Sequence, residues 1–571
     1  MQKTNPDAWL SKRAGTILGY ADLGGDQPSL QDVHDKLRPL NRTNVVERLA
    51  WINALTNSWQ LVENSDDDRR VRAYVLPNWQ ARIENWCKNN NNNEVWIFPR
   101  FTVLWLMRQA FVACSPEGER IDTREELERL GEACLMANNV APFPNQPERL
   151  ATSLEIAVNL VPNIDYFSRG EHDLDIARMH YILTDVAPAS PKQALREFPG
   201  KIERLLGCSL NDWRDLAILT AMMPMSAETS AVDTFRLPDS KIENFANPVI
   251  APEQTKKYLQ SISCDERGFA QEFSSSTAPA ADLTFFREYP FLWLDDVYVP
   301  LDAGFILDKA GRGLLWSAIK RAKGTEGGQL LTDWGHLVEA YVNQLLQLAP
   351  RPGRRVIPNP QFSNGNEAFD TCIIEGQTMI VVETKSGTIP SAAKYSNDSQ
   401  KFGAALTSKF VDEGLTQLSK SILRFDSGQP LHDSTGAAVS LGSISKIIPV
   451  LASLEDSLRA PMLSDHLSQC FQDMGMPKRI VMTPLLLLPV TGLEEIVGYL
   501  GDFDLTLIIE SFLTSQRTDP LATFRLDTIP MLKGSTRPEN RDLDRFRSAW
   551  RDALGRLFPA ESAEEFLSRS I

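Results

Sequence analysis

The segment EAFDTCIIEGQTMIVVETKSG, from Glu367 to Gly387, decides the fold of the C-terminal half of this chain. Two apolar runs flank the turn signal Glu375-Gly376, so the segment is predicted to form a β-hairpin. Side chains alternate across a strand, which puts Glu383 and Lys385 on the same face of the second strand. A carboxylate and an ammonium group are therefore expected side by side in an otherwise apolar setting.

Asp370 on the first strand joins this face if the hairpin loop has an even number of residues. A two-residue loop pairs Asp370 with Val381, diagonal to Glu383, whereas a four-residue loop places it directly opposite Glu383. Mg²⁺ and Mn²⁺ prefer hard oxygen ligands such as these two carboxylates. Lys385 can orient a water molecule and offset charge that develops on a phosphate. The hairpin therefore predicts a divalent-metal site at Asp370 and Glu383.

The same residues carry a resemblance to a known family. The pattern Phe369-Asp370, twelve intervening residues and Glu383-x-Lys385 resembles the PD-(D/E)XK nuclease superfamily, which has the restriction-endonuclease-like fold. The resemblance covers roughly residues 325–430. Phe369 stands where the family has a variable proline. The fold class implied is an α/β restriction-endonuclease-like C-terminal domain joined to a large all-α N-terminal region.

Two helices extend the resemblance on either side of the hairpin. WGHLVEAYVNQLL is similar to the first helix of that fold, where a glutamate often joins the metal site, and this implies a ligand role for Glu339. VDEGLTQLSKSILRF resembles the helix after the catalytic strand, where several subfamilies have a glutamine, and Gln417 is the equivalent. The alternatives are a solvated glutamate at the edge of an apolar stripe and a polar helix face.

The function implied is Mg²⁺-dependent (or Mn²⁺-dependent) hydrolysis of DNA phosphodiester bonds. Asp370, Glu383 and Glu339 would hold the metal, and Lys385 would position the water. Helical regions joined to such nucleases resemble bacterial restriction and anti-phage defence effectors, which is analogy at the level of fold. RNA is not excluded as the substrate. Since [D/E]xK triplets also arise by chance, the rival interpretation is a non-catalytic DNA- or protein-binding scaffold subunit of a defence or repair complex.

Other charged residues near the hairpin are weaker candidates. Six cations can contact phosphates or can be ordinary loop charges: Arg351, Arg354, Arg355, Lys394, Lys401 and Lys409. His336 is expected to be structural, with a general-base role as the alternative. Five arginines near the C-terminal end alternate with aspartates and are expected on a solvated helix face: Arg537, Arg541, Arg545, Arg551 and Arg556.

Helical periodicity dominates residues 1–285, for example in TREELERLGEACLMANN. Ser190-Pro191 is expected to begin a further helix. The polar run KNNNNNE suggests a break near residues 88–98 between two helical subdomains. SSSTAPAAD is a linker candidate, and residues 286–571 are expected to form the nuclease domain, with FLWLDDVYVPLD as a strand pair and ISKIIPVLA and RIVMTPLLLLPV as buried strands. We expect the helical region to recognise protein partners or to control the nuclease.

Composition excludes several classes of protein. The 571-residue chain has seven scattered cysteines without a CxxC pair, which argues against a disulfide framework and a zinc cluster. No apolar run is long enough for a membrane span, and the N-terminal residues lack a signal peptide, so a cytoplasmic location is expected. The net charge of −15 opposes non-specific binding to polyanions, although a local basic groove remains compatible with it.

Overall fold

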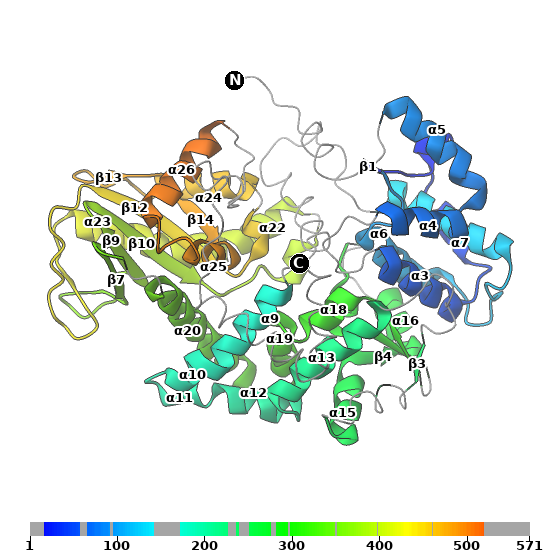
Figure 1. Cartoon of the computed structure of the whole chain (residues 1–571), viewed down its shortest axis with the longest axis horizontal. Coiled ribbons are helices and arrows are strands. Elements are labelled where there is room, and N and C mark those ends of the chain that lie inside the picture. The colour runs from blue at the N-terminus through cyan, green and yellow to red at the C-terminus, as the bar shows by residue number, and fades with distance from the viewer. Residues whose placement is uncertain are drawn as a thin grey trace.

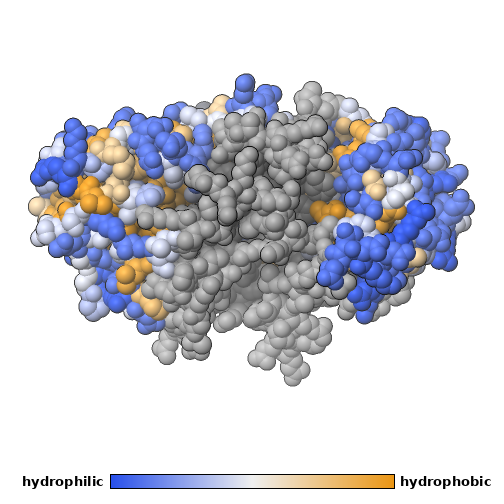
Figure 2. All heavy atoms as spheres, turned by 90° about the horizontal axis from the view of Figure 1, so that it is seen from above, coloured by the Kyte–Doolittle hydropathy of each residue, from blue (hydrophilic) through white to orange (hydrophobic). Residues whose placement is uncertain are grey.

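The computed structural model shows two lobes joined by a helical layer (Figure 1). The structure describes residues 16–56, 65–91, 95–141, 172–225, 236–238, 242, 250–275, 281–294, 297–348, 351–396, 398–459 and 461–518. The arginine-rich segment from Arg537 to Arg556 lies outside these residues. Both lobes turn mostly hydrophilic side chains, with scattered hydrophobic ones, towards the viewer of Figure 2.

A mixed six-stranded sheet organises the C-terminal lobe. Its strands run in the order β13-β12-β10-β9-β7, and β14 also pairs with β12. The pairs made by β12 are parallel, whereas β9 is antiparallel to both β10 and β7. The bounds are β7 Arg354–Pro358, β9 Thr371–Glu375, β10 Thr378–Lys385, β12 Lys446–Ser453, β13 Val481–Met482 and β14 Leu486–Pro489.

The β9–β10 hairpin has a two-residue turn, Gly376-Gln377, because Glu375 pairs with Thr378. Gly376 has a φ of +60°, a left-handed conformation that favours glycine. The turn begins one residue later than the predicted Glu375-Gly376. This register pairs Thr371 with Val382, so Asp370 lies in line with Glu383 on the neighbouring strand. The register therefore places the two residues opposite each other, an alignment that the sequence predicted for a four-residue loop.

Helices cover both faces of this sheet, as the alternating pattern of β10 requires. Ile380 and Val382 pack in one hydrophobic core with α20 (Glu326–Gln347), α25 (Val490–Val497) and α26 (Leu505–Thr518). Met379 and Val381 face a second core. That core includes side chains of α22 (Ser399–Leu406), the π-helix η6 (Thr407–Leu415), α23 (Thr416–Asp426) and α24 (Pro461–Asp473). The C-terminal lobe is a three-layer α/β structure.

Among its described residues, the N-terminal lobe is helical apart from one pair of two-residue strands. Its helices are α2 Leu30–Leu37, α3 Arg42–Thr56, α4 Ser65–Val75, α5 Gln80–Asn90, α6 Arg100–Ala113 and α7 Arg124–Val140, with 3-10 turns η1 Ala21–Leu23 and η2 Pro77–Trp79. The strands β1 (Thr16–Ile17) and β2 (Val95–Trp96) are parallel. The predicted capping of α7 is confirmed, since Thr123 and Glu126 form a reciprocal capping box.

The polar run near residues 88–98 does not separate two cores. Helix α5 ends at Asn90, yet Ile83 before the run and Phe101 after it belong to the same hydrophobic cluster. A polar surface loop can connect two segments whose apolar side chains pack in the same core. The described residues between 16 and 141 thus share one hydrophobic core.

A middle layer connects the two lobes. It contains α9 His172–Tyr181, the π-turn η4 Ile182–Val186, α10 Ala187–Ala189, α11 Gln193–Arg196, α12 Phe198–Leu206, α13 Leu210–Met225, α15 Pro252–Ile262, α16 Glu266–Ser275, α17 Thr284–Glu288, α18 Ala303–Asp308 and α19 Arg312–Arg321. It also holds a small sheet of β3 Leu237–Pro238, β4 Ser263–Asp265, β5 Phe291–Leu294 and β6 Val297–Pro300. The predicted strand pair in FLWLDDVYVPLD is confirmed by β5 and β6.

Hydrophobic packing runs across residue 285. Side chains of α9, α12 and α13 share one core with α20 and the central sheet. Arg178 on α9 donates to Glu494 on α25, and Tyr341 on α20 donates to the same carboxylate. The described part of residues 1–285 is therefore predominantly helical, and its second half packs on the C-terminal lobe. The domain boundary near residue 285 stays a prediction.

Two smaller expectations were wrong. Ser190 follows the end of α10 and Pro191 precedes a short turn, so they do not begin a helix, and α11 starts at Gln193. The RIVMTPLLLLPV segment forms two strands rather than one. The two strands flank Pro484, which has no backbone N–H to continue the ladder. Among the described helices, none combines the length and apolar character that a bilayer crossing requires.

Candidate functional site

The predicted site residues meet in one cleft at the carboxyl end of β10. The cleft has a volume of about 1450 Å³. Its lining includes all five residues singled out from the sequence: Glu339, Asp370, Glu383, Lys385 and Gln417. They come from α20, the β9–β10 hairpin and α23, which lie on different sides of the sheet.

Three carboxylates form a compact cluster in this cleft. Glu339, Glu367 and Asp370 each offer an oxygen atom, and these atoms lie within 4.8 Å of one another. Asp370 is buried, Glu339 is half-buried and Glu367 is exposed. The backbone N–H of Thr384 donates to Oδ2 of Asp370 at 2.6 Å and fixes that carboxylate against β10. Glu339 and Asp370 are thus brought together as predicted.

Asn359 holds the cluster in place. Its Nδ2 donates to Glu339 and, at 2.7 Å, to Oε1 of Glu367. Its backbone N–H donates to the carbonyl oxygen of Asp370 at 2.9 Å, and Asn343 donates to its Oδ1. The φ of Asn359 is +46°, a left-handed conformation that asparagine tolerates better than most residues. Sequence reasoning missed Asn359 and Glu367, although Glu367 lies only three residues before Asp370.

Glu383 is arranged differently from the other acids. Its side chain is 1% exposed, and Oε1 lies 2.8 Å from Nζ of Lys385. Apart from this ion pair, neither oxygen accepts a hydrogen bond from the described part of the chain. The same-face alternation of Glu383 and Lys385 brings the two groups together, two residues apart on one strand. A buried carboxylate with a single cationic partner is costly, because its remaining lone pairs are unsatisfied.

The electrostatics of the site disfavour negative charge. Burial, then the neighbouring carboxylates of Glu383 and Glu339, raise the pKa of Asp370 well above its usual range. Burial also raises the pKa of Glu383 to about 7, although Lys385 opposes this shift. Burial raises the pKa of Glu339, against the hydrogen bond from Asn359. Such shifts mark groups held close together against their own repulsion.

Lys385 is the cation at the centre of the site. Burial lowers its pKa, but Glu383 and Asp370 outweigh burial and raise it, so the side chain stays charged. Gly414 on the π-helix η6 lies close to Lys385, and a Cβ there would approach its Cε to 3.2 Å. π-helical segments are rare and often occur at functional sites. Gln417 lines the same cleft two residues into α23.

The donor set fits a hard divalent cation. Four carboxylates line one end of the cleft: Glu339, Glu367, Asp370 and Glu383. Nζ of Lys385 lies 2.8 Å from Glu383, and Nδ1 of the partly exposed His336 lies 3.7 Å from Glu339. Oxygen-only ligands with a buried, unsatisfied carboxylate suit Mg²⁺ or Mn²⁺ rather than a softer metal. Glu339, Glu367 and Asp370 would hold such an ion, with Glu383 beside them.

Most of the other predicted phosphate contacts lie elsewhere. Arg354 is paired with Glu375 at the turn end of the hairpin, and Arg355 donates to the carbonyl of Ser440. Arg351 lies 3.5 Å from Asp504. These side chains do not line the cleft. They sit at the wrong end of the sheet, because β7 runs antiparallel to β9 and carries them away from Asp370.

The cations after the hairpin differ among themselves. Lys394 is buried and its Nζ lies 2.8 Å from Oε1 of Glu455, which makes it a structural residue. Lys401 is exposed near Asp398 and outside the cleft lining. Lys409 lines the cleft, is 42% exposed and lies 3.9 Å from Glu413. Of the six predicted phosphate contacts, Lys409 is the one that can reach a ligand in the cleft.

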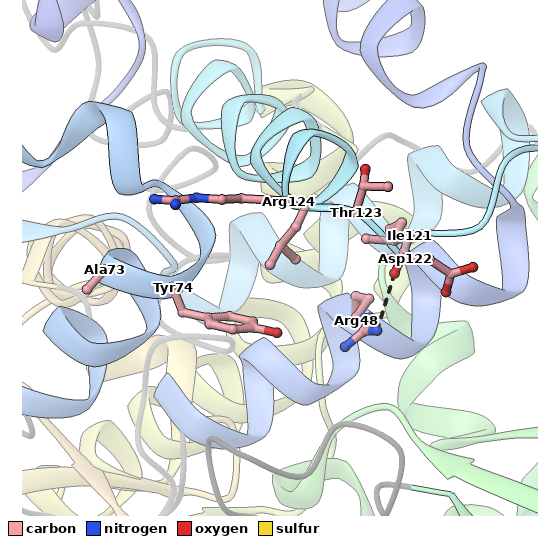
Figure 3. Close-up of a pocket in the computed structure, with 8 residues that line it drawn as sticks. Arg48, Ala73, Tyr74, Ile121, Asp122, Thr123 and Arg124 are labelled. Carbon is pink, nitrogen blue, oxygen red and sulfur yellow. Dashed lines mark hydrogen bonds between the residues drawn. The ribbon is translucent and has the colours of Figure 1, made fainter.

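A second pocket, of about 370 Å³, lies in the N-terminal lobe (Figure 3). It is lined by Arg48, Ala73, Tyr74, Ile121, Asp122, Thr123, Arg124 and Leu127. Arg48 donates to the carbonyl of Ile121, and Asp122 is the single acid in this lining. One carboxylate beside two arginines is not a metal site. The carboxylate cluster near β10 is the one that offers metal-type geometry within the residues described.

Comparisons of the chain with protein-family models, with curated proteins and with solved structures give no match. The site is therefore interpreted from its own residues and geometry.

Proposed function

We propose that the chain is a divalent-metal-dependent nuclease of the PD-(D/E)XK type that hydrolyses DNA phosphodiester bonds. The observation that carries the proposal is the meeting of Asp370, Glu383 and Lys385 with Glu339 at one strand terminus, in a cleft open to solvent. We further propose that it acts in the cytoplasm as a restriction-type or anti-phage effector, and that its helical N-terminal region binds protein partners that control it.

Each residue has a defined task in this proposal. A bound Mg²⁺ or Mn²⁺ supplies Lewis-acid activation of the phosphodiester and makes a water molecule more acidic. Glu339, Glu367 and Asp370 would bind the ion, and the Thr384 N–H and Asn359 would keep their oxygens oriented. Lys385, held by Glu383, orients the attacking water and offsets charge on the phosphate.

The test is a cleavage assay with full-length protein. Plasmid, single-stranded DNA and RNA are incubated with Mg²⁺, with Mn²⁺ or with EDTA. Cleavage of DNA with either metal, abolished by EDTA and by Glu383→Gln, is the expected result. Preference for RNA would overturn the DNA assignment, and cleavage of nothing under any condition would overturn the nuclease proposal.

One observation favours a non-catalytic scaffold as the second candidate. Lys385 already neutralises Glu383 without any metal, so the pair can serve as a packing element. Calorimetric titration with Mg²⁺ and Mn²⁺ separates the two candidates. A scaffold shows no metal binding that depends on Asp370, whereas the nuclease loses metal binding in Asp370→Asn.

A further inference from the structure

The cleft extends beyond the carboxylates along a wall of different chemistry. This wall, called the α19 wall, consists of Tyr289, Lys309, Arg312, Trp316, Lys320 and Arg321. Arg312, Trp316 and Lys320 are four residues apart on α19 and therefore share one helix face. The lining of the same cleft also includes the acids of the candidate active site. One continuous surface thus joins a basic and aromatic wall to a carboxylate cluster.

Trp316 is the most exposed tryptophan of the described residues at 45%. Within those residues it stacks on no ring and lies under no cation, unlike Trp213, over which Arg321 is placed. Leu331 on α20, which is 42% exposed, lines the same cleft. A large flat side chain left open inside a cleft is a stacking platform for a planar ligand rather than a core residue.

Two cations of the α19 wall have no carboxylate partner among the described residues. Lys309 is only 4% exposed and makes no ion pair, although it lines the cleft. Arg321 donates to the carbonyl of Ser317 and to no acid. Burial lowers the pKa of Lys309 to about 8, with Arg287 and Arg321 acting in the same direction and Asp308 opposing them. A buried, unpaired ammonium group beside two guanidinium groups is stabilised by an anion.

The remaining charges of the wall are already compensated. Arg312 pairs with Asp175, and Lys320 pairs with Glu288 and donates to Tyr289. Arg287 pairs with Asp308 through two hydrogen bonds. Lys309 and Arg321 are therefore the cations of this wall without a carboxylate partner among the described residues, and they line the same cleft as the open ring of Trp316. A ligand that has both an anionic group for these cations and a planar ring for Trp316 has the chemistry of a nucleotide.

We propose that the α19 wall binds a single strand of nucleic acid, with Lys309 and Arg321 contacting its phosphates and Trp316 stacking on a base. This inference rests on the proposed nuclease function and names its substrate as single-stranded. A duplex hides the faces of its bases in its own stack, so an aromatic platform reaches them only in an unpaired strand. The strand then runs along the cleft to the carboxylates.

Binding measurements on the full-length Glu383→Gln protein test the proposal without cleavage. The probes are labelled oligothymidylate, oligouridylate and a DNA duplex, followed by fluorescence anisotropy. Trp316→Ala is expected to weaken single-strand binding about 5- to 100-fold and to leave duplex binding unchanged. Trp293→Ala is the matched control, because Trp293 is 44% exposed and lies outside the cleft lining. Tighter binding of the thymidylate or of the uridylate indicates whether the DNA or the RNA strand is preferred.

The cations are tested by salt dependence. Lys309→Met, which keeps the volume of the buried stem, and Arg321→Gln are each expected to reduce the salt slope by about one. Lys256→Gln, at an exposed lysine of α15, is the control for a lost surface charge. Thermal unfolding of each variant shows whether it is folded. Should Lys309→Met fail to fold, Arg321→Gln and Trp316→Ala still decide the question.

The outcomes separate this inference from the nuclease proposal. If the Trp316→Ala protein binds single strands as tightly as the Trp293→Ala protein, the proposal that the α19 wall binds single strands is wrong. It is also wrong if Trp316→Ala weakens the binding of duplex and of single strands equally. A protein that cuts DNA but shows either result retains the nuclease proposal alone. A protein that binds single strands through Trp316 and cuts nothing overturns the nuclease proposal and keeps the binding surface.

Discussion

Two buried lysine–glutamate pairs in the same cleft behave in opposite ways. In both Lys385–Glu383 and Lys394–Glu455, Nζ lies 2.8 Å from Oε1. Burial raises the pKa of Glu455, but Lys394 and several hydrogen bonds outweigh it and lower that pKa. Burial instead raises the pKa of Glu383 to about 7 despite Lys385. The two pairs are alike in composition and differ in their surroundings.

Hydrogen bonding explains the difference. Glu455 accepts the backbone N–H groups of Ile389 and Ser457 and the Ser457 hydroxyl, in addition to Lys394. Glu383 has none of these donors among the described residues. In the Lys394–Glu455 pair the carboxylate is fully hydrogen-bonded, and the pair ties the loop after β10 to the end of β12. In the Lys385–Glu383 pair the carboxylate keeps oxygen lone pairs without a hydrogen-bond donor among the described residues, and free lone pairs are what a metal ligand requires.

The largest expected effect is on catalysis. Glu383→Gln and Lys385→Met should each reduce DNA cleavage by about 10²–10³-fold or more, because Lys385 acts on the reacting phosphate and water and Glu383 holds Lys385 in place. The double variant should be little worse than either single one, since residues acting as a unit are not additive. Glu413→Gln, the same change at a 57% exposed acid of the cleft, is the control in the plasmid assay. Wild-type cleavage rates in both active-site variants would show that the Lys385–Glu383 pair has only a structural role.

The two lysine variants should rank in the opposite order when the free energy of unfolding is compared. Lys394→Met leaves the charge of Glu455 buried and unpaired, and we expect it to lower the free energy of unfolding by about 3–5 kcal/mol. Lys385→Met should cost clearly less, because Glu383 can take up a proton near neutral pH. Urea denaturation of both variants without divalent metal compares the two losses. Equal losses would show that the pairs are equivalent.

The pH dependence distinguishes the pairs by sign. Glu383 has a pKa of about 7 when folded against an ordinary value of 4.5, so the folded chain binds its proton more tightly. Its contribution to stability therefore falls as the pH rises from about 4.5 to about 7, and Asp370 acts in the same direction. Glu455, with a lowered pKa, contributes stability above the ordinary value and loses it as the pH falls.

Thermal unfolding across this range measures both contributions. Glu383→Gln should reduce the loss of stability between about pH 4.5 and 7, whereas Glu455→Gln should not. Mg²⁺ should raise the unfolding temperature more at about pH 8 than at about pH 5, since only ionised carboxylates bind it. A Mg²⁺ effect that is independent of pH would contradict a carboxylate site.

The smallest expected effect concerns the orientation of the cluster. Asn359→Gly removes the side chain that bonds Glu339 and Glu367 but suits the left-handed backbone. We expect Mg²⁺ affinity to fall about 10- to 100-fold, as for other groups that orient metal ligands. Asn366→Gly is the control, because its side chain is exposed and outside the cleft lining. Isothermal titration that finds equal affinities would show that Asn359 is not a positioning residue.

Local patterns in the chain were enough to predict the elements that carry the site. Period-two alternation gave the β9–β10 hairpin and the shared face of Glu383 and Lys385, and helical periodicity gave α20 with Glu339. These predictions succeeded because side-chain direction within one strand or helix depends only on local geometry. The resemblance of the hairpin to the PD-(D/E)XK family remains a prediction.

What the sequence by itself determined is thus the list of chemical groups and the face on which each lies. Only the tertiary structure decided the one-residue shift of the turn that aligns Asp370 with Glu383, the entry of Glu367 and Asn359 into the cluster, and the removal of Arg354 to the far end of the sheet. The tertiary structure also decided which of the two lysine–glutamate pairs has a fully hydrogen-bonded carboxylate. The distant Ile389 N–H and Lys394 ammonium, together with the neighbouring Ser457, donate hydrogen bonds to Glu455, and no such set reaches Glu383 among the described residues. The long-range part of this pairing is set by packing rather than by local periodicity.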